Sequence, residues 1–364
     1  MSHFVLRVST PGRVCLFGEH QDYLGLPVVP CAISVRIQIE GSARPDRLVR
    51  IDLPDIDSSM SFQLGERLTY SGTRDYFRSS VNVLLRKGFT FSAGCDCTVR
   101  GNIPINSGTS SSSALIVSWI AFLARLSDQQ KSLEPLEIAT LAHEAEVLEF
   151  GEPGGMMDHF STACGGVLAI DFQPALKVRE IPVTLGTFVL GDSQQPKDTT
   201  AILARVKLGV LQIVKNLQDR HPDFSLQTAD AETLGRVARE LSPAERELLQ
   251  GTIRNRDITR EARQLMSRPS MDHRRMGELL SLHQDILRDV LWISTPKIDG
   301  MISAAMAAGA YGAKINGSGG GGCMFAYAPE SPEIVADAIE RAGGKAVVVT
   351  TDAGTRTEIL QAAD

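Results

Sequence analysis

The segment with the clearest potential for chemistry is "PINSGTSSSSAL", residues 104–115, where a glycine and small polar residues lead directly into an apolar pattern. Small residues let the backbone approach a ligand closely, and a helix that starts there offers unpaired N–H groups and a positive dipole end. An ordinary helix cap needs one hydroxyl, whereas residues 109–113 supply five. The pattern therefore favours a phosphate site over simple capping.

A second segment, "HEAEVLEFGEPGGMMDHFSTACGG" at residues 143–166, contains a carboxylate in an apolar setting. Its glutamates fall on a predicted helix, where charged side chains usually face solvent. Asp158 differs, because it follows a Pro-Gly-Gly turn and lies between Met157 and His159. A carboxylate in such surroundings needs a partner or a function. Asp158 is therefore a candidate functional residue.

A third segment, "KINGSGGGGCMFAYA" at residues 314–328, contains glycines with the spacing of the dinucleotide fingerprint. That fingerprint binds a pyrophosphate only when a strand precedes it and a helix follows. Here "CMFAYA" predicts a strand, which argues against a dehydrogenase. Two interpretations of the glycine run remain open, a ligand loop and the close packing of two backbones.

The elements around these segments predict an α+β protein. Strand patterns with β-branched residues and amphipathic helix patterns occur without regular alternation. Strands are predicted at 3–9, 33–40, 48–53, 96–101, 323–328 and 345–351, and helices at 111–126, across most of 198–308, and at 331–343. The change of pattern near residues 181–198 predicts two domains, 1–185 and 186–364.

Composition excludes several classes of partner. The chain of 364 residues has 43 acidic and 37 basic side chains without a long block of either sign, so we expect no nucleic-acid or membrane partner. Its longest apolar run is shorter than the roughly 20 residues that cross a bilayer. The N-terminus lacks a secretion pattern and the six cysteines are scattered, which predicts free thiols and a cytoplasmic location.

Three motifs in this order, "PGRVCLFGEH", "PINSGTSSSSAL" and "KINGSGGGGC", resemble those of the GHMP kinases, small-molecule kinases named for galactose, homoserine, mevalonate and phosphomevalonate. "GEHQDYLGLPVVPCAI" and "AEVLEFGEPGGMMDHF" are most similar to galactokinase patterns, with Glu149 in place of a usual phenylalanine. Mevalonate kinases normally carry lysine where this chain has Arg13. The resemblance implies a two-domain GHMP kinase fold, with an N-terminal domain like ribosomal protein S5 domain 2 and a ferredoxin-like C-terminal domain.

The same resemblance implies an enzyme that transfers the γ-phosphate of ATP to a sugar hydroxyl, converting galactose to galactose 1-phosphate, in the cleft between the domains. Kinases of other acceptors and a non-catalytic sugar and ATP sensor are the alternatives. Arg13 would lie beside the reacting oxygen, and its charge would keep Asp158 ionised as the base or orienting group. The residues implied at the sugar are Glu19, His20, Asp22 and Gly155.

The ATP phosphates would meet the second and third motifs, and a magnesium ion would neutralise their charge. The phosphate-binding residues implied are Gly108, Thr109, Ser110, Ser111, Ser112, Ser113, Gly319 and Gly320. Ser112 and Glu146 would hold Mg²⁺, which needs few protein ligands. The sequence does not distinguish a monomer from a dimer.

Two departures from the galactokinase pattern leave the acceptor open. Cys15 stands where galactokinases usually have asparagine, and "GDSQQPKDTTAILARVK" replaces an arginine-rich stretch. The alternative acceptors are a related hexose, a deoxysugar, a heptose phosphate, a sugar acid and mevalonate. An anionic sugar would need an extra cation, for which Lys197 and Arg205 are the local candidates.

Overall fold

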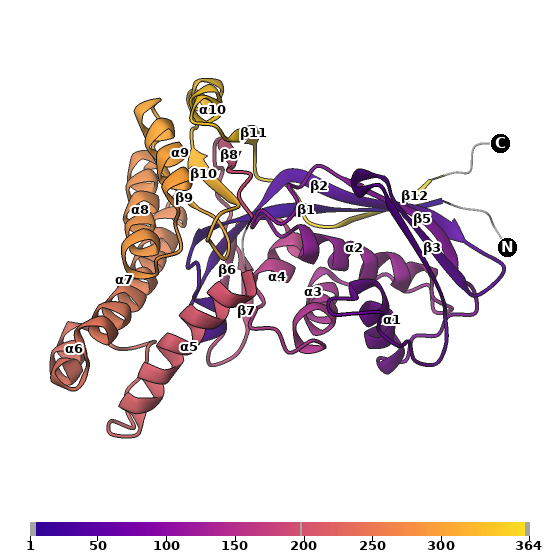
Figure 1. Cartoon of the computed structure of the whole chain (residues 1–364), viewed down its shortest axis with the longest axis horizontal. Coiled ribbons are helices and arrows are strands. Elements are labelled where there is room, and N and C mark those ends of the chain that lie inside the picture. Colours follow the sequence, from indigo (N-terminus) through magenta and orange to yellow (C-terminus); the bar gives the residue numbers. More distant parts are fainter. Residues whose placement is uncertain (1–4, 197–198, 361–364) are drawn as a thin grey trace.

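The computed structural model describes residues 5–196 and 199–360, which form two large sheets, a two-stranded hairpin and the associated helices (Figure 1). The first sheet has the strand order β12-β1-β2-β5-β3-β4, with β3 and β5 parallel and the other neighbouring strands antiparallel. Its strands are β1 (Val5–Phe17), β2 (Val29–Ala43), β3 (Leu48–Leu53), β4 (Ser58–Gln63), β5 (Cys95–Gly101) and β12 (Arg356–Leu360).

Helices cover one face of this sheet and bury its apolar side chains. Helix α2 contacts both β1 and β2, and α1, α3 and α4 pack around α2. Figure 1 shows the four helices together beneath the sheet. They are α1 (Tyr76–Arg86), α2 (Ser111–Leu126), α3 (Pro135–His143) and α4 (Met157–Cys164), with a single π-helical turn at Glu144–Leu148 after α3. A short hairpin of β6 (Leu168–Asp171) and β7 (Lys177–Glu180) follows α4.

The second sheet is antiparallel, with the order β11-β8-β10-β9. Numbered along the chain, its strands lie in the order 4-1-3-2 with helical connections after the first and third, which is the ferredoxin-like plan. Its strands are β8 (Phe188–Asp192), β9 (Gly312–Ile315), β10 (Cys323–Tyr327) and β11 (Lys345–Val349).

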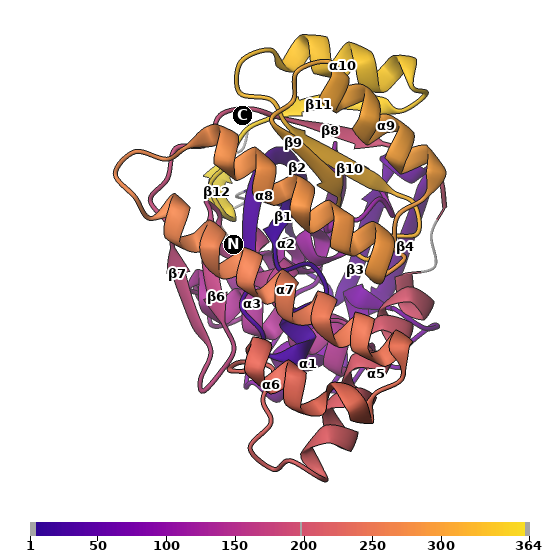
Figure 2. The same ribbon diagram turned by 90° about the vertical axis from the view of Figure 1, so that its left-hand side faces the viewer.

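Within the described residues, five α-helices lie in the connection from β8 to β9, and a sixth joins β10 to β11 (Figure 2). Helices α8 and α9 pack on β9 and β10, while α10 packs on β8, so the sheet gains an apolar cover. The helices are α5 (Thr199–Gln218), α6 (Ala231–Val237), α7 (Pro243–Met266), α8 (His273–Asp285), α9 (Pro296–Ala307) and α10 (Pro332–Arg341).

The last strand returns to the first sheet. Strand β12 pairs antiparallel with β1, from Val5 opposite Leu360 to Ser9 opposite Arg356. The division into 1–185 and 186–364 stays a prediction, but the final strand of the predicted second domain lies in the sheet of the first. One core of buried side chains runs through both sheets, so the two halves are packed together.

The structure confirms the α+β prediction, and each predicted strand overlaps an observed one. Most ends differ by a few residues, but β1 continues to Phe17, eight residues beyond the predicted end at Ser9. The predicted helices at 111–126 and 331–343 are α2 and α10, and helices also dominate residues 199–307. The predicted helix start at residue 198 lies outside the described residues. Within the described chain, no helix combines the length and apolar character that a membrane span requires.

Candidate active site

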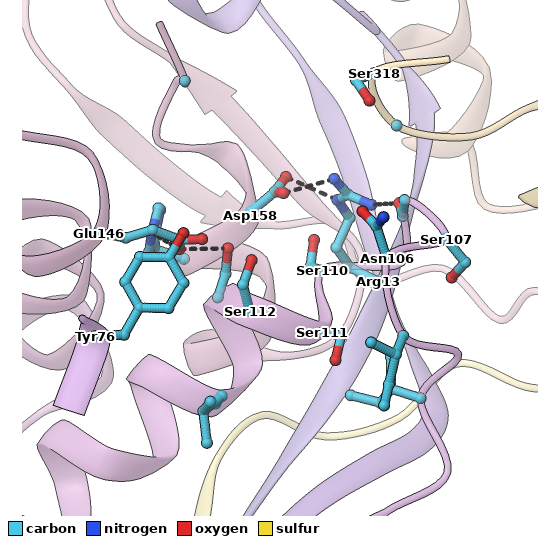
Figure 3. A pocket seen from close by; sticks show the side chains of 18 of the residues that line it. Arg13, Tyr76, Asn106, Ser107, Ser110, Ser111, Ser112, Glu146, Asp158 and Ser318 are labelled. Carbon is cyan, nitrogen blue, oxygen red and sulfur yellow. Dashed lines mark hydrogen bonds and ion pairs between the residues drawn. The ribbon is translucent and has the colours of Figure 1, made fainter. Parts of the chain in front are cut away.

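A cavity of about 460 Å³ lies where the three motifs meet (Figure 3). Its walls include residues between 13 and 23, at the end of β1 and just after it, together with the loop before α2, the start of α4 and the loop after β9. One end, the carboxylate end, is formed by Glu19, Asp22 and Asp158 with Arg13 beside them. The lining also contains apolar side chains, here called the apolar end: Ile37, Leu53, Ile56, Val99, Ile103, Ile105 and Leu115.

Arg13 and Asp158 form a bidentate ion pair at the carboxylate end. Arg13 donates from Nε to Oδ1 over 2.8 Å and from Nη2 to Oδ2 over 2.7 Å, and Figure 3 shows the two side chains facing each other. Burial alone would raise the pKa of Asp158, but the Arg13 charge and hydrogen bonds hold it below the ordinary carboxyl value. Asp158 is therefore ionised at neutral pH, as expected from its pairing with a cation.

The second motif presents the start of α2 to the cavity. Ser110, the residue before the helix, has a left-handed backbone (φ 61°), and its side chain makes no capping hydrogen bond. The first-turn N–H groups of a helix lack intrahelical acceptors, and the cavity is lined by Ser110, Ser111, Ser112 and Ser113 at this point. Figure 3 shows Ser110, Ser111 and Ser112 at the helix start, with Asp158 nearby. This geometry suits an anion.

Two residues hold the loop before α2 in place. Arg13 donates its backbone N–H to the Thr109 carbonyl and its Nη1 to the Gly108 carbonyl. Asn316 donates from Nδ2 to the same Gly108 oxygen over 2.8 Å. The Thr109 side chain is fully buried and bonds within the loop, so Thr109 does not line the cavity.

Glu146 and Ser112 supply hard oxygen atoms beside the helix start. Burial alone would raise the pKa of Glu146, but hydrogen bonds from His159, Ser112 and Ser113 and the charge of His159 hold it below the ordinary value. An ionised carboxylate and an exposed serine hydroxyl on the cavity wall fit Mg²⁺, which keeps several water ligands. No cluster of three or more histidine, cysteine or acidic side chains suited to a metal occurs in the described residues.

Asp22 is positioned by a glycine and by backbone amides. Its Oδ1 accepts from the Tyr23 N–H over 2.8 Å, and its Oδ2 accepts from the Met157 N–H over 3.2 Å. A Cβ on Gly155 would lie 1.8 Å from that Oδ2, so a side chain there is incompatible with this position of Asp22. Burial and then the Asp158 charge raise the pKa of Asp22 to about 6.

Glu19 is tied to the third motif. Lys314 is fully buried in β9, and its Nζ donates to Glu19 Oε2 over 3.0 Å and to the Cys15 carbonyl over 2.9 Å. The Gly317 N–H donates to the same Glu19 oxygen over 3.0 Å. The first and third motifs therefore meet at a buried ion pair.

His20 lines the cavity, but both of its ring nitrogens have partners. Nε2 lies 3.1 Å from the Ser318 carbonyl, and Nδ1 lies 2.7 Å from the Tyr23 hydroxyl. Burial lowers the pKa of His20 to about 4, so the ring is neutral; because a carbonyl only accepts, Nε2 carries the proton. A direct contact of His20 with a substrate hydroxyl stays a prediction.

Most of the glycine run packs against neighbouring backbone or apolar side chains. A Cβ on Gly317 would lie 2.7 Å from the Gly108 carbonyl oxygen, so these backbones approach closely. Side chains on Gly319 and Gly320 would collide with Ile293 and Ile202. Gly317 and Ser318 line the cavity, whereas Gly319 and Gly320 do not. Close backbone packing accounts for much of the run, and phosphate contacts from Gly319 and Gly320 stay a prediction.

Among the described residues before and along α5, Leu203 lines the cavity and no lysine or arginine does. The Arg205 guanidinium donates to the carbonyls of Leu291 and Trp292. Lys197, the other local candidate for binding an anionic acceptor, lies outside the described residues.

Sequence analysis overlooked two side chains that organise the site, Lys314 and His159. Lysine in the otherwise apolar strand before the glycine run was a signal for a buried ion pair. His159 stands where the galactokinase pattern M-D-Q-F has glutamine, a departure that the comparison of motifs missed.

Models of known families match three parts of the chain. The GHMP kinases N terminal domain matches residues 75–166, and the GHMP kinases C terminal model matches residues 262–345. The galactokinase galactose-binding signature matches residues 5–43, which contain Arg13, Glu19 and Asp22.

Relatives of two kinds cover nearly the whole chain. The mevalonate kinase of Pyrococcus furiosus is 29% identical over 354 residues, which cover 93% of this chain and 94% of the relative. The galactokinase of Mannheimia succiniciproducens is 27% identical over 367 residues, with 93% and 90% covered.

Solved structures share the fold. Lactococcus lactis galactokinase complexed with galactose superposes with a TM-score of 0.84 at 22% identity, covering 97% of this chain and 95% of that one. Methanococcus jannaschii mevalonate kinase gives a TM-score of 0.70 at 20% identity, with 96% and 99% covered.

Proposed function

The chain belongs to the GHMP kinase superfamily, and on that premise we propose that it phosphorylates a neutral sugar with ATP, galactose being the first candidate. GHMP kinases are phosphotransferases with alcohol acceptors, so the proposal concerns which alcohol this chain phosphorylates. The galactose-binding signature over residues 5–43 supports a sugar.

The charge at the carboxylate end carries the proposal. Glu19, Asp22 and Asp158 converge there, and carboxylates accept hydrogen bonds from hydroxyls but repel another carboxylate. Three arginines line the described cavity: Arg13 pairs with Asp158, Arg74 pairs with Glu152, and Arg100 follows Val99 of the apolar end along β5. A neutral polyol suits this set of charges better than an anionic acceptor does.

Mevalonate is the second candidate, because mevalonate kinases are among the relatives that cover 93% of the chain. Its carboxylate would need a cation that is not already paired. Lys314, close to the carboxylate end, is fully buried and bound to Glu19. Arginine at position 13, where mevalonate kinases normally have lysine, also favours the sugar.

Asp158 and Arg13 would act on the attacking hydroxyl. With its pKa lowered by Arg13, Asp158 is a weak base, which fits a loose transition state in which the proton leaves late. We infer that Asp158 orients the hydroxyl and accepts its proton as the new O–P bond forms and the bond from the γ-phosphorus to the oxygen that leaves on ADP breaks. Arg13 would balance the negative charge that gathers between the hydroxyl and the phosphoryl group.

The remaining walls suit the nucleotide. The N–H groups at the start of α2 would bind the phosphates, and the apolar end would receive the base. Ser112 and Glu146 would hold Mg²⁺, which neutralises phosphate charge when it is bound. We assign His20 a positioning role, because it holds Tyr23 and the Ser318 carbonyl.

The test is ADP release with Mg-ATP across galactose, other hexoses, fucose, arabinose, hexuronic acids, a heptose phosphate and mevalonate, followed by NMR of the product. Phosphate on the anomeric oxygen of galactose, with turnover lost in Asp158→Asn, is the expected result. Turnover confined to an anionic acceptor would overturn the proposal. Binding of galactose and ATP without any turnover would instead support the sensor.

A further inference from the structure

His159 is a buried polar side chain with one conspicuous partner. It follows Asp158 in α4, is 2% exposed, and its Nε2 lies 2.7 Å from Glu146 Oε2. Its Nδ1 is buried and has no hydrogen-bond partner within the described chain. Burying an imidazole is unfavourable unless it is hydrogen-bonded, so the contact with Glu146 is the polar interaction that stabilises this ring in place.

The same Glu146 oxygen has a second donor. Ser113 Oγ donates to Oε2 over 2.8 Å, from the first turn of α2. Because a carboxylate only accepts, His159 donates from Nε2. Two donors on one oxygen fix the carboxylate plane and leave the other oxygen, Oε1, as the stronger candidate for binding a cation.

Other neighbours in the described chain make no hydrogen bond to the His159 ring. The His143 ring packs edge-on against His159 at 5.3 Å between centroids. Burial lowers the pKa of His143 to about 4, so it is a neutral neighbour at pH 7. Asp158, one residue earlier, bonds Arg13 rather than His159.

We propose that His159 is a positioning residue for the metal site: its hydrogen bond to Oε2 orients Glu146 so that Oε1 and the Ser112 hydroxyl can bind Mg²⁺ together. This inference rests on the proposed use of Mg-ATP, but not on the identity of the acceptor. Partners that orient a metal ligand typically contribute 10- to 100-fold to metal affinity. The glutamine of the galactokinase pattern also has an N–H donor at the end of its side chain.

The experiment measures ADP binding by calorimetry over a range of MgCl₂ concentrations and without divalent metal. Four variants are compared with the wild type: His159→Leu, which removes the donor; His159→Asn, a shorter polar side chain; His159→Gln, which restores a donor; and His143→Leu, which removes the neighbouring buried imidazole. None of these measurements contains an acceptor, so a failure of galactose as substrate would leave the result unaffected.

We expect His159→Leu and His159→Asn to raise the Mg²⁺ concentration for half-maximal enhancement of ADP binding by about 10-fold or more, with metal-free ADP binding unchanged. His159→Gln should stay within about threefold of the wild type, as should His143→Leu. An unchanged Mg²⁺ dependence in folded His159→Leu or His159→Asn would overturn the proposal. So would equal losses with and without Mg²⁺, or a His159→Gln variant as impaired as His159→Leu.

Discussion

Replacing Gly155 with alanine should damage sugar binding through Asp22. The new Cβ would start 1.8 Å from Asp22 Oδ2, and such contacts are essentially never shorter than 3.0 Å. The carboxylate would therefore have to retreat by about 1.2 Å, which also breaks its 3.2 Å hydrogen bond from the Met157 N–H. Gly155 has an ordinary backbone conformation, so alanine causes no strain of its own there.

The expected loss follows from the hydrogen bonds that Asp22 would no longer make. A hydrogen bond to a charged group contributes about 1.5–3 kcal/mol, and 1.4 kcal/mol is about tenfold in affinity. Losing one such bond predicts a rise of roughly 10- to 100-fold in the KM for galactose, with the KM for ATP within about twofold of wild type. The assay is coupled ADP release with each substrate varied in turn.

Gly154→Ala is the matched control. Its Cβ would lie 3.3 Å from a Val147 methyl group, which can shift slightly, and it does not approach Asp22. Gly154→Ala should keep a near-normal KM for galactose. If Gly155→Ala behaved like Gly154→Ala, or if galactose and ATP were affected equally, the assigned position of Asp22 would be refuted.

Three further changes test other parts of the site. The pKa of Asp22 is raised to about 6; below that pH the carboxyl is protonated and a poorer acceptor, so kcat/KM for galactose should fall as pH drops through 6. A flat profile in the wild type, or the same fall in Asp22→Asn, would contradict this. Asp158→Asn should lower kcat by about 100-fold or more while ADP binding is kept; near-normal turnover would refute its role. Lys314→Met leaves the buried Glu19 carboxylate without its cation and should lower the free energy of unfolding by about 3–5 kcal/mol in urea titrations. Adding Glu19→Gln, which removes the unpaired charge, should restore part of that stability. No recovery would argue against the ion pair as the cause.

Local patterns predicted the elements that carry the site. Helix α2 and strands β3 and β10 follow from periodicity and β-branched residues within each segment, because side-chain periodicity reflects which face is buried. The serine run at the start of α2 was likewise visible as a potential anion site. These features depend on neighbours in sequence.

Contacts between distant segments could not be predicted in the same way. The Lys314–Glu19 pair joins residues 295 positions apart, and β12 pairs with β1 across nearly the whole chain. The glycine run illustrates the difficulty, since its spacing fits a ligand loop while Gly317 and Gly322 pack on the loop before α2. Whether a glycine run binds a ligand or packs against another backbone depends on which distant segment lies next to it in the fold, and a single sequence does not specify that segment.

The most direct test of the account is the ratio of kcat/KM for galactose to that for mevalonate, measured with saturating Mg-ATP at pH 7.5. Placing a carboxylate beside Glu19, Asp22 and Asp158 should cost several kcal/mol, on the order of 100-fold or more. The account predicts that galactose is favoured by at least that factor. A ratio below one would show that the carboxylate end accepts an anion and would contradict the proposal of a neutral sugar.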